Sequence, residues 1–164
     1  MKKLITCLVT IALCLFPSTT SSYSQENWVG SWSTSPVEFS VQKFFGNRFK
    51  DFGLHHLTFR TVIKPTLTGE TVRLTFSNTY GTGPMTIDAV TIAKTISKQR
   101  IKVHTKKYVT FNGSKKVTLR KGETVYSDLL DYHVDALEPV TVSMYMKNTD
   151  QLKTFGLIGG YNLY

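Results

Sequence analysis

Residues 71–76 read Thr-Val-Arg-Leu-Thr-Phe, and this short stretch decides the fold class. Its apolar residues alternate with polar ones, which is the pattern of a strand with one face on a core and the other in water. The run at 57–63 (LTFRTVI) is of the same type, and a Thr-Gly pair at 68–69 predicts a turn between the two.

Similar runs continue to the end of the chain, at 85–92, 108–111, 117–119, 124–127, 140–146 and 155–161. Asn112 and Gly113 predict a hairpin that joins 108–111 to 117–119. About eight to ten short strands without intervening helices predict an all-β, antiparallel fold. We favour a jelly-roll-like β-sandwich over a barrel.

Length and composition indicate one folded domain. The chain has 164 residues, of which 41% are hydrophobic and 19% charged, so it is neither disordered nor fibrous. Twenty Lys and Arg against eleven Asp and Glu give a formal charge of +9. This charge favours an anionic partner.

The first 24 residues have the layout of a secretory signal peptide. Lys2 and Lys3 precede a 13-residue apolar run at 4–16, which Pro17 ends. Such a run is too short to span a bilayer, although a retained anchor is the alternative. We therefore expect an exported protein (secreted, periplasmic or on the cell surface) whose single domain covers 25–164, without a transmembrane segment after cleavage.

Export removes both cysteines, because Cys7 and Cys14 lie in the signal peptide. Residues 25–164 then have no disulfide and no Cys ligand, and the loss of two lysines lowers the charge from +9 to +7. Stability must come from apolar burial.

Motifs for catalysis, metals and cofactors are missing from the sequence. The four His show no H-x-H or H-x₃-H spacing, and no phosphate-binding loop occurs. G-x-S-x-G and G-D-S are also absent. We expect no catalytic residue, no metal site and no cofactor.

One segment, at 41–52, departs from the β pattern. Its apolar residues share one side of a helical wheel, which predicts a short amphipathic helix. They are Val41, Phe44, Phe45, Phe49 and Phe52. Three interpretations are open: the segment caps one end of the sandwich, it docks another domain, or it lies as a basic helix on a membrane surface.

A cationic stripe is predicted at 98–106. Lys98, Arg100, Lys102, His104 and Lys106 follow at every second position, so an extended strand would place them on one face. Such a stripe suits an anionic wall polymer or membrane, or it is a solvated edge strand whose lysines discourage aggregation. Because the chain is exported, we expect no nucleic-acid partner.

Several motifs, in order, resemble the N-terminal region of secreted bacterial SGNH (GDSL-type) hydrolases. They are WVGSWSTSP at 28–36, TFRT at 58–61, VRLTFSNTYGTGPMTIDAVTIA at 72–93, YVTFNG at 108–113, GETVYSD at 122–128 and VTVSMY at 140–145. In that family the region is a β-sandwich placed before an esterase domain. The resemblance thus implies an accessory module of an SGNH-type catalytic domain, in cis or in trans.

The catalytic blocks of that family (GDS, G-x-N-D and D-x-x-H) do not occur, so no catalytic residue is carried over. The resemblance implies that the module contacts substrate or docks the catalytic domain. Trp28, Trp32 and Tyr80 would form a glycan-binding face, since flat rings stack on sugars. The alternative is that both tryptophans belong to the core.

Overall fold

The computed structural model describes residues 28–38, 55–98, 100–150, 152–156 and 161–163. These residues form antiparallel strands almost throughout, so the all-β class is confirmed. In the described ranges the one helical element is a single 3-10 turn, η2 (Val103–Thr105). The amphipathic helix expected at 41–52 lies outside the described residues.

The strands, in chain order, are β1 (Pro36–Glu38), β2 (His55–Ile63), β3 (Gly69–Val72), β4 (Thr75–Ser77), β5 (Met85–Ile87), β6 (Ala89–Ser97), β7 (Arg100–Ile101), β8 (Lys107–Val109), β9 (Val117–Leu119), β10 (Thr124–Tyr126), β11 (Leu130–Val134), β12 (Val140–Asn148), β13 (Thr154–Gly156) and β14 (Tyr161–Leu163). The final run expected at 155–161 is thus represented by two short strands, β13 and β14.

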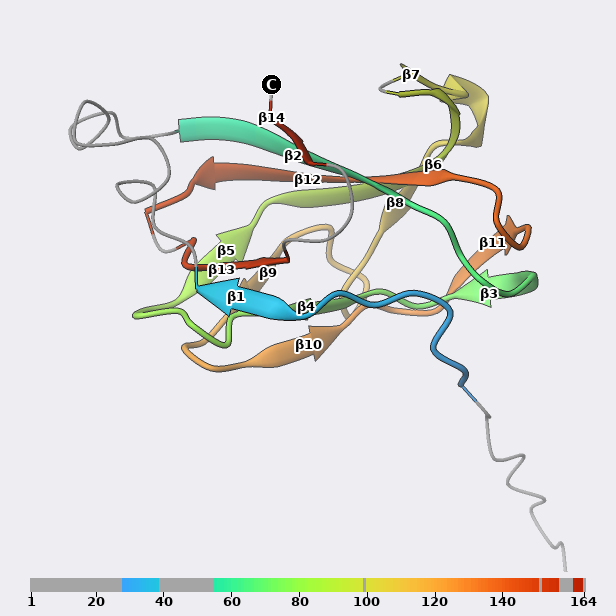
Figure 1. Ribbon diagram of the computed structural model, residues 1–164. Coiled ribbons are helices and arrows are strands. Elements are labelled where there is room, and N and C mark those ends of the chain that lie inside the picture. The colour runs from blue at the N-terminus through green and yellow to red at the C-terminus, as the bar shows by residue number, and fades with distance from the viewer. Residues whose placement is uncertain (1–27, 39–54, 99, 151, 157–160, 164) are drawn as a thin grey trace, which may run out of the picture.

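The strands lie in two layers (Figure 1). The main sheet has the order β14-β2-β12-β6, and both β7 and β8 pair with the remaining edge of β6. The ladders β1–β13, β4–β10 and β3–β11 face it across the core. The short ladder β5–β9 continues from the main sheet, because β5 leads directly into β6.

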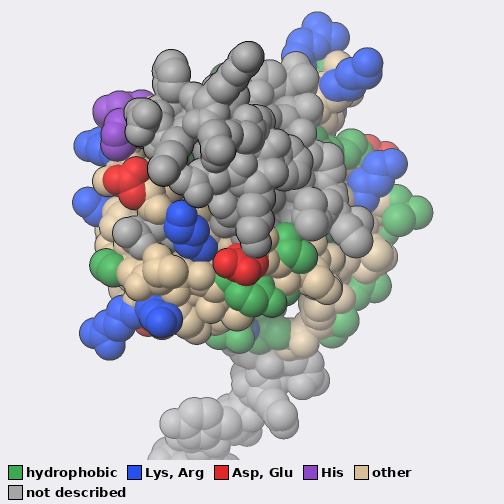
Figure 2. Space-filling model, turned by 60° about the vertical axis from the view of Figure 1, so that its left-hand side comes forward, with side chains coloured by type: hydrophobic (Ala, Val, Ile, Leu, Met, Phe, Trp, Pro, Cys, Tyr) green, Lys and Arg blue, Asp and Glu red, His purple; other side chains and the backbone are tan. Residues whose placement is uncertain are grey.

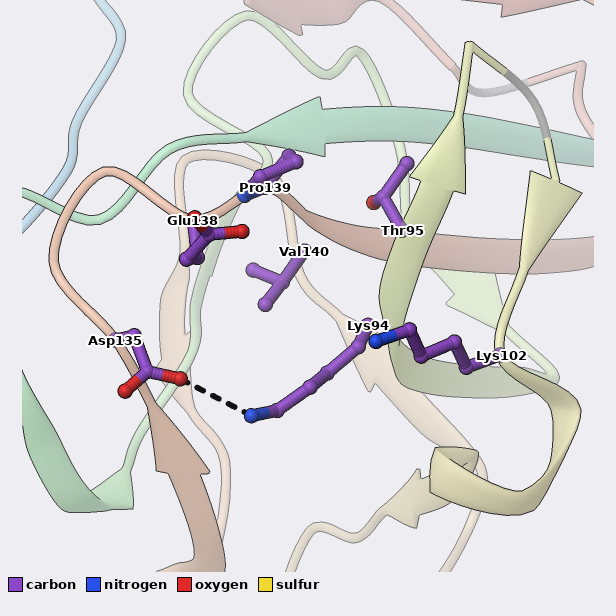
Figure 3. A pocket seen from close by; sticks show the side chains of 7 residues that line it. All are labelled: Lys94, Thr95, Lys102, Asp135, Glu138, Pro139 and Val140. Carbon is purple, nitrogen blue, oxygen red and sulfur yellow. Dashed lines mark hydrogen bonds and ion pairs between the residues drawn. The ribbon is translucent and has the colours of Figure 1, made fainter.

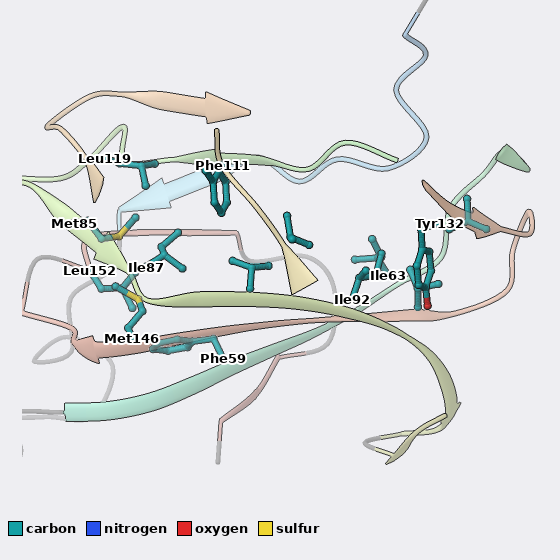
Figure 4. Packing of buried hydrophobic residues seen from close by; sticks show 14 residues of the cluster. Phe59, Ile63, Met85, Ile87, Ile92, Phe111, Leu119, Tyr132, Met146 and Leu152 are labelled. Atoms are coloured by element: carbon teal, nitrogen blue, oxygen red, sulfur yellow. The ribbon is translucent and has the colours of Figure 1, made fainter. Parts of the chain in front are cut away.

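The core fills the space between the layers (Figure 4). Ile87, Ile92, Leu119 and Met146 are at most 1% exposed, and they come from both the main sheet and the β5–β9 ladder. Each such side chain stabilises the fold by about 1.5–3 kcal/mol through removal of apolar surface from water. Without disulfides in the described residues, this burial is the main stabilising term.

The run expected as one strand at 85–92 is interrupted at Asp88. The backbone N–H of Asp88 donates to the Tyr145 carbonyl (2.9 Å), and its carboxylate accepts the N–H of Lys147 (2.9 Å). Here the chain changes partner, from β9 before Asp88 to β12 after it. The carboxylate replaces a backbone acceptor for β12, so this ladder bond is made by a side chain.

The run at 71–76 is also divided, into the end of β3 and the start of β4. Leu74 exchanges two hydrogen bonds with Ser127: its carbonyl accepts the Ser127 N–H (2.8 Å), and its N–H donates to the Ser127 hydroxyl (2.9 Å). Because β10 and β11 are consecutive, β3 and β4 still form one irregular antiparallel ribbon with them.

The hairpin predicted around Asn112 and Gly113 is partly wrong. The turn exists: both residues have positive φ (50° and 78°), and Phe111 and Ser114 exchange two backbone hydrogen bonds. The strands beyond it separate, however, since β8 pairs with β6 and β9 pairs with β5. Pairing with the long strand β6 and with the buried strand β5 takes precedence over extending a two-stranded hairpin, which is marginal alone.

Candidate functional site

The candidate site lies along the edge of β6 that pairs with β7 and β8, where the cationic run at 98–106 returns beside it. The extended strand expected there is wrong, because η2 interrupts it between β7 and β8. Thr105 explains the interruption: its hydroxyl accepts the Lys94 N–H (2.9 Å) and donates to the Lys102 carbonyl (2.6 Å). The Thr105 side chain therefore replaces a backbone acceptor for β6 at the point where the backbone of residues 103–105 turns away from that strand.

This turn distributes the cations over three places instead of one face. Lys98 and Arg100 lie on the β6–β7 hairpin, Lys102 lines a hollow beside β6, and Lys106 leads into β8. Lys98 has a positive φ of 30°, and Arg100 donates from Nε to the Ser97 hydroxyl (3.4 Å). The structure does not bring the predicted stripe together as one row.

Near Lys106, however, the fold assembles a cationic cluster that the sequence does not reveal. The ammonium groups of Lys115 and Lys106 lie 3.9 and 5.9 Å from the ring centroid of Tyr108, which is 45% exposed. Attraction between a cation and an aromatic ring contributes about 0.5–1 kcal/mol at exposed sites. Lys115 was missed by the sequence analysis, although the Asn-Gly turn before it is a signal that the chain reverses there.

The hollow of about 160 Å³ beside β6 contains both charges (Figure 3). The Lys94 ammonium binds the Asp135 carboxylate at 3.1 Å, and Lys102 enters from the β7 side. Glu138 and Thr95 contribute further polar groups to its wall. Because the hollow is lined by both acids and lysines, it favours an anionic ligand less than a site lined by cations alone would.

Asp135 also belongs to a chain of charged groups that joins the two layers. His133 donates to the carboxylates of Glu70 (2.8 Å) and Asp135 (2.9 Å), one from each ring nitrogen. These hydrogen bonds, first that of Asp135 and then that of Glu70, raise the pKa of His133. The His133 contact, followed by that of Lys94, lowers the pKa of the Asp135 carboxyl. While it is protonated, with both N–H groups bound to carboxylates, the imidazole has no lone pair for a metal or a serine proton.

The pKa values of Asp128 and Tyr132 are also shifted by their surroundings. Asp128 accepts hydrogen bonds from the Thr110 hydroxyl and from the N–H groups of Gly113 and Asn112, and these lower its pKa. Burial raises the pKa of the Tyr132 phenol. Asp128 closes the turn that leads to Lys115, so it supports the candidate site indirectly.

The three expected glycan-binding residues do not meet in one place. Trp28 and Trp32 are 39% and 37% exposed and lie outside the strands, so the structure does not support the alternative that they are core residues. The Arg73 guanidinium lies over Trp28 at 4.4 Å and over Tyr126 at 5.0 Å.

Tyr80 lies near the other end of the 28–38 segment. Its N–H donates to the Thr154 hydroxyl (2.8 Å), and Thr154 pairs with Glu38 in the β1–β13 ladder. The segment crosses the second layer between these ends (Figure 1). A single glycan-binding surface made of all three aromatic residues is therefore not assembled.

The motif at 77–84 forms a surface loop that is hydrogen-bonded around the buried side chain of Asn78. Asn78 is fully buried, and its Nδ2 donates to the carbonyls of Gly83 (3.0 Å), Leu119 (3.3 Å) and Arg120 (3.1 Å). Its backbone carbonyl accepts the N–H groups of Gly81 and Gly122. One side chain thus ties the 78–84 loop to the β9–β10 turn.

Groups for catalysis do not converge in the described part of the chain. Ser31 accepts the Leu67 N–H on its hydroxyl (3.1 Å), which gives it a role in a turn. No cluster of three His, Cys, Asp or Glu able to hold a metal occurs among the described residues, and none of their helices is long and apolar enough to cross a membrane. The docking residues expected at 41–52 lie outside the described ranges.

Cations exceed acids on the visible surface, where Lys and Arg side chains stand at several places around the rim (Figure 2). No protein-family model and no curated protein matches the chain. The features that bear on function are the fold, the hydrogen-bonded loop around Asn78 and the cationic side chains beside β6.

Proposed function

We propose that this chain is a secreted, non-catalytic accessory β-sandwich module of an SGNH/GDSL-type hydrolase. It contacts a glycan or ester substrate, or it docks a catalytic esterase domain. The observation that supports this is the hydrogen-bonded loop around Asn78. The SNTYGTGP motif at 77–84, central to the resemblance, is a surface loop organised by hydrogen bonds from the buried Asn78 side chain. A motif with so specific a structural use supports a resemblance that extends to the fold.

The first test is esterase activity of the exported chain on p-nitrophenyl acetate. We expect no turnover above a heat-denatured control, because a serine needs a positioned base and an oxyanion hole. Turnover that a single Ser→Ala substitution abolishes would contradict the non-catalytic role.

Docking of a catalytic domain is tested with the product of a neighbouring reading frame that carries a G-D-S block. Titration calorimetry should detect binding to the exported chain, and Phe45→Ser with Phe49→Ser should weaken it. The same pair should abolish dimerisation or dye binding by an exposed apolar patch. A chain that stays monomeric, silent to dye and without affinity for that domain contradicts the docking role.

Contact with glycan is tested by tryptophan fluorescence. Acetylated polysaccharide fragments should change the emission of Trp28 or Trp32, since a stacked sugar would displace the Arg73 guanidinium from Trp28. Unchanged emission at millimolar ligand would remove these tryptophans from the substrate surface.

A second candidate function is retention on an anionic wall polymer or membrane surface. The observation that favours it is that, among the described residues, Lys98, Arg100, Lys102 and Lys106 make no ion pair. Binding through these side chains should weaken steeply between about 50 and 200 mM salt. Cell-wall retention that survives replacement of all four by Gln would exclude this function.

A further inference from the structure

We propose that Tyr108, Lys106 and Lys115 form a binding site for the anionic groups of an acidic polysaccharide, which crosses the outer face of the main sheet towards Arg60. This inference rests on the second function proposed above and assigns it a site and a ligand class. The shared chemistry is a polymer that bears repeated carboxylate or phosphate groups.

The cluster has two ammonium groups, and the part of the chain that the structure describes offers neither of them an acidic partner. Lys115 and Lys106 both lie within 6 Å of the Tyr108 ring centroid, and neither makes an ion pair with any described residue. The electron-rich ring attracts both cations. No acidic side chain among the described residues neutralises either of them, so the site favours an acidic ligand over a neutral one.

Rigid local structure holds both lysines in place. Lys115 follows the turn whose ends, Phe111 and Ser114, exchange two backbone hydrogen bonds, and Asp128 accepts two N–H groups of the same turn. The N–H of Lys106 donates to the Val103 carbonyl and closes η2. Less conformational entropy is lost on binding when the groups that bind are already ordered.

The outer face of the sheet provides a polar path away from this cluster. Tyr108 pairs with Thr91, Thr91 with Ser143, and Ser143 with Arg60. These side chains point outward, since their strand neighbours Val109, Val90 and Phe59 are buried.

The path is polar along its length, and its side chains beyond Tyr108, those of Thr91, Ser143 and Arg60, are half-buried. It crosses four strands, about 14 Å at the usual strand spacing. Arg60 donates from Nε to the Ser143 hydroxyl (3.2 Å), so a cation is oriented at its far end. A polymer is the ligand that uses both a cationic cluster and an extended polar path.

The experiment measures binding of the exported chain to polygalacturonate, with fully methyl-esterified polygalacturonate as the uncharged match. Poly(glycerol phosphate) distinguishes phosphate from carboxylate as the anion. We expect binding to at least one acidic polymer, none to the ester, and an affinity that rises with oligomer length before it levels off.

Variants locate the site. Lys106→Gln with Lys115→Gln should weaken binding by at least about tenfold, because charge-assisted hydrogen bonds are the stronger class. The control pair Lys64→Gln and Lys121→Gln removes the same charge elsewhere and should stay within about twofold. Tyr108→Phe keeps the ring and should bind, whereas Tyr108→Leu should bind weakly. Circular dichroism confirms that each variant is folded.

Other outcomes overturn the proposal. If Lys98→Gln, Arg100→Gln and Lys102→Gln together abolish binding while the Lys106 and Lys115 pair does not, polymer binding stands and this site is wrong. If the chain binds neither acidic polymer, or binds only phosphatidylglycerol vesicles, the polysaccharide assignment fails. Failure to bind polymers and vesicles alike would remove the second proposed function as well.

Discussion

Gly81 lies directly against the side-chain amide of Asn78, so closely that a Cβ at position 81 would overlap the Asn78 amide atoms. Asn78 in turn holds three carbonyls through its Nδ2. Spacing of Asn and Gly by three residues is therefore a packing requirement of this loop.

Gly81→Ala should destabilise the fold by about 1–3 kcal/mol, because overpacking a closed site forces shifts of neighbouring atoms. Urea unfolding measures the change. Gly30→Ala is the matched control, since a Cβ at Gly30 meets nothing within 4 Å. Equal effects at the two positions would show that close packing against Asn78 is not the cause.

Asn78→Asp, nearly identical in shape, should lower the free energy of unfolding by at least ~2 kcal/mol. The substitution replaces the buried donor with an acceptor, and unsatisfied buried partners cost about 1–3 kcal/mol each. Thermal and urea unfolding give the value. A variant as stable as wild type would mean that the three carbonyls do not depend on Nδ2.

The contacts of His133 predict a loss of stability at alkaline pH. Its pKa is raised in the folded protein, because Asp135 and Glu70 accept its two N–H groups. The stabilisation is complete below about pH 6.5, the pKa of unfolded His, and is lost as the pH rises through the folded value. His133→Gln should therefore flatten the stability profile in this range. An imidazole that titrates by NMR below pH 6.5 would contradict the prediction.

Asp128 predicts the opposite dependence, at acid pH. Its folded pKa is lowered, first by the Thr110 hydroxyl and then by the N–H groups of the turn. Its stabilisation is present above about pH 3.9, the unfolded value, and disappears as the pH falls through the folded one. Asp128→Asn should remove this acid-sensitive part from the urea-unfolding profile. Identical acid profiles for the two proteins would exclude a role for the ionised carboxylate.

The strand pattern could be predicted from the sequence, because alternation of apolar and polar residues is a local property. The stretches at 57–63 and 140–146 lie within β2 and β12, the two central strands of the main sheet. Which strands pair with one another could not be predicted from this local pattern. The Asn-Gly turn is present, yet its flanking strands pair with β6 and β5, because ladders with longer or buried neighbours are more stable than an isolated hairpin.

The cationic run illustrates the same limit for the site. Cationic residues at every second position predicted one stripe at 98–106. In the structure the chain forms η2 there, and the Thr105 hydroxyl hydrogen-bonds both to the Lys94 N–H of β6 and to the Lys102 carbonyl. Conversely, Lys106 and Lys115 are nine positions apart and no periodicity relates them. They meet at Tyr108 because β8 and the following turn place them there.

By itself, the sequence determined the all-β class, the positions of several strands and the excess of positive charge, since these follow from local periodicity and composition. The tertiary structure decided which strands pair, that Asn78 joins two loops, and which cations gather around one ring. Those features depend on contacts between residues far apart in the chain, where burial and hydrogen bonding outweigh local preference.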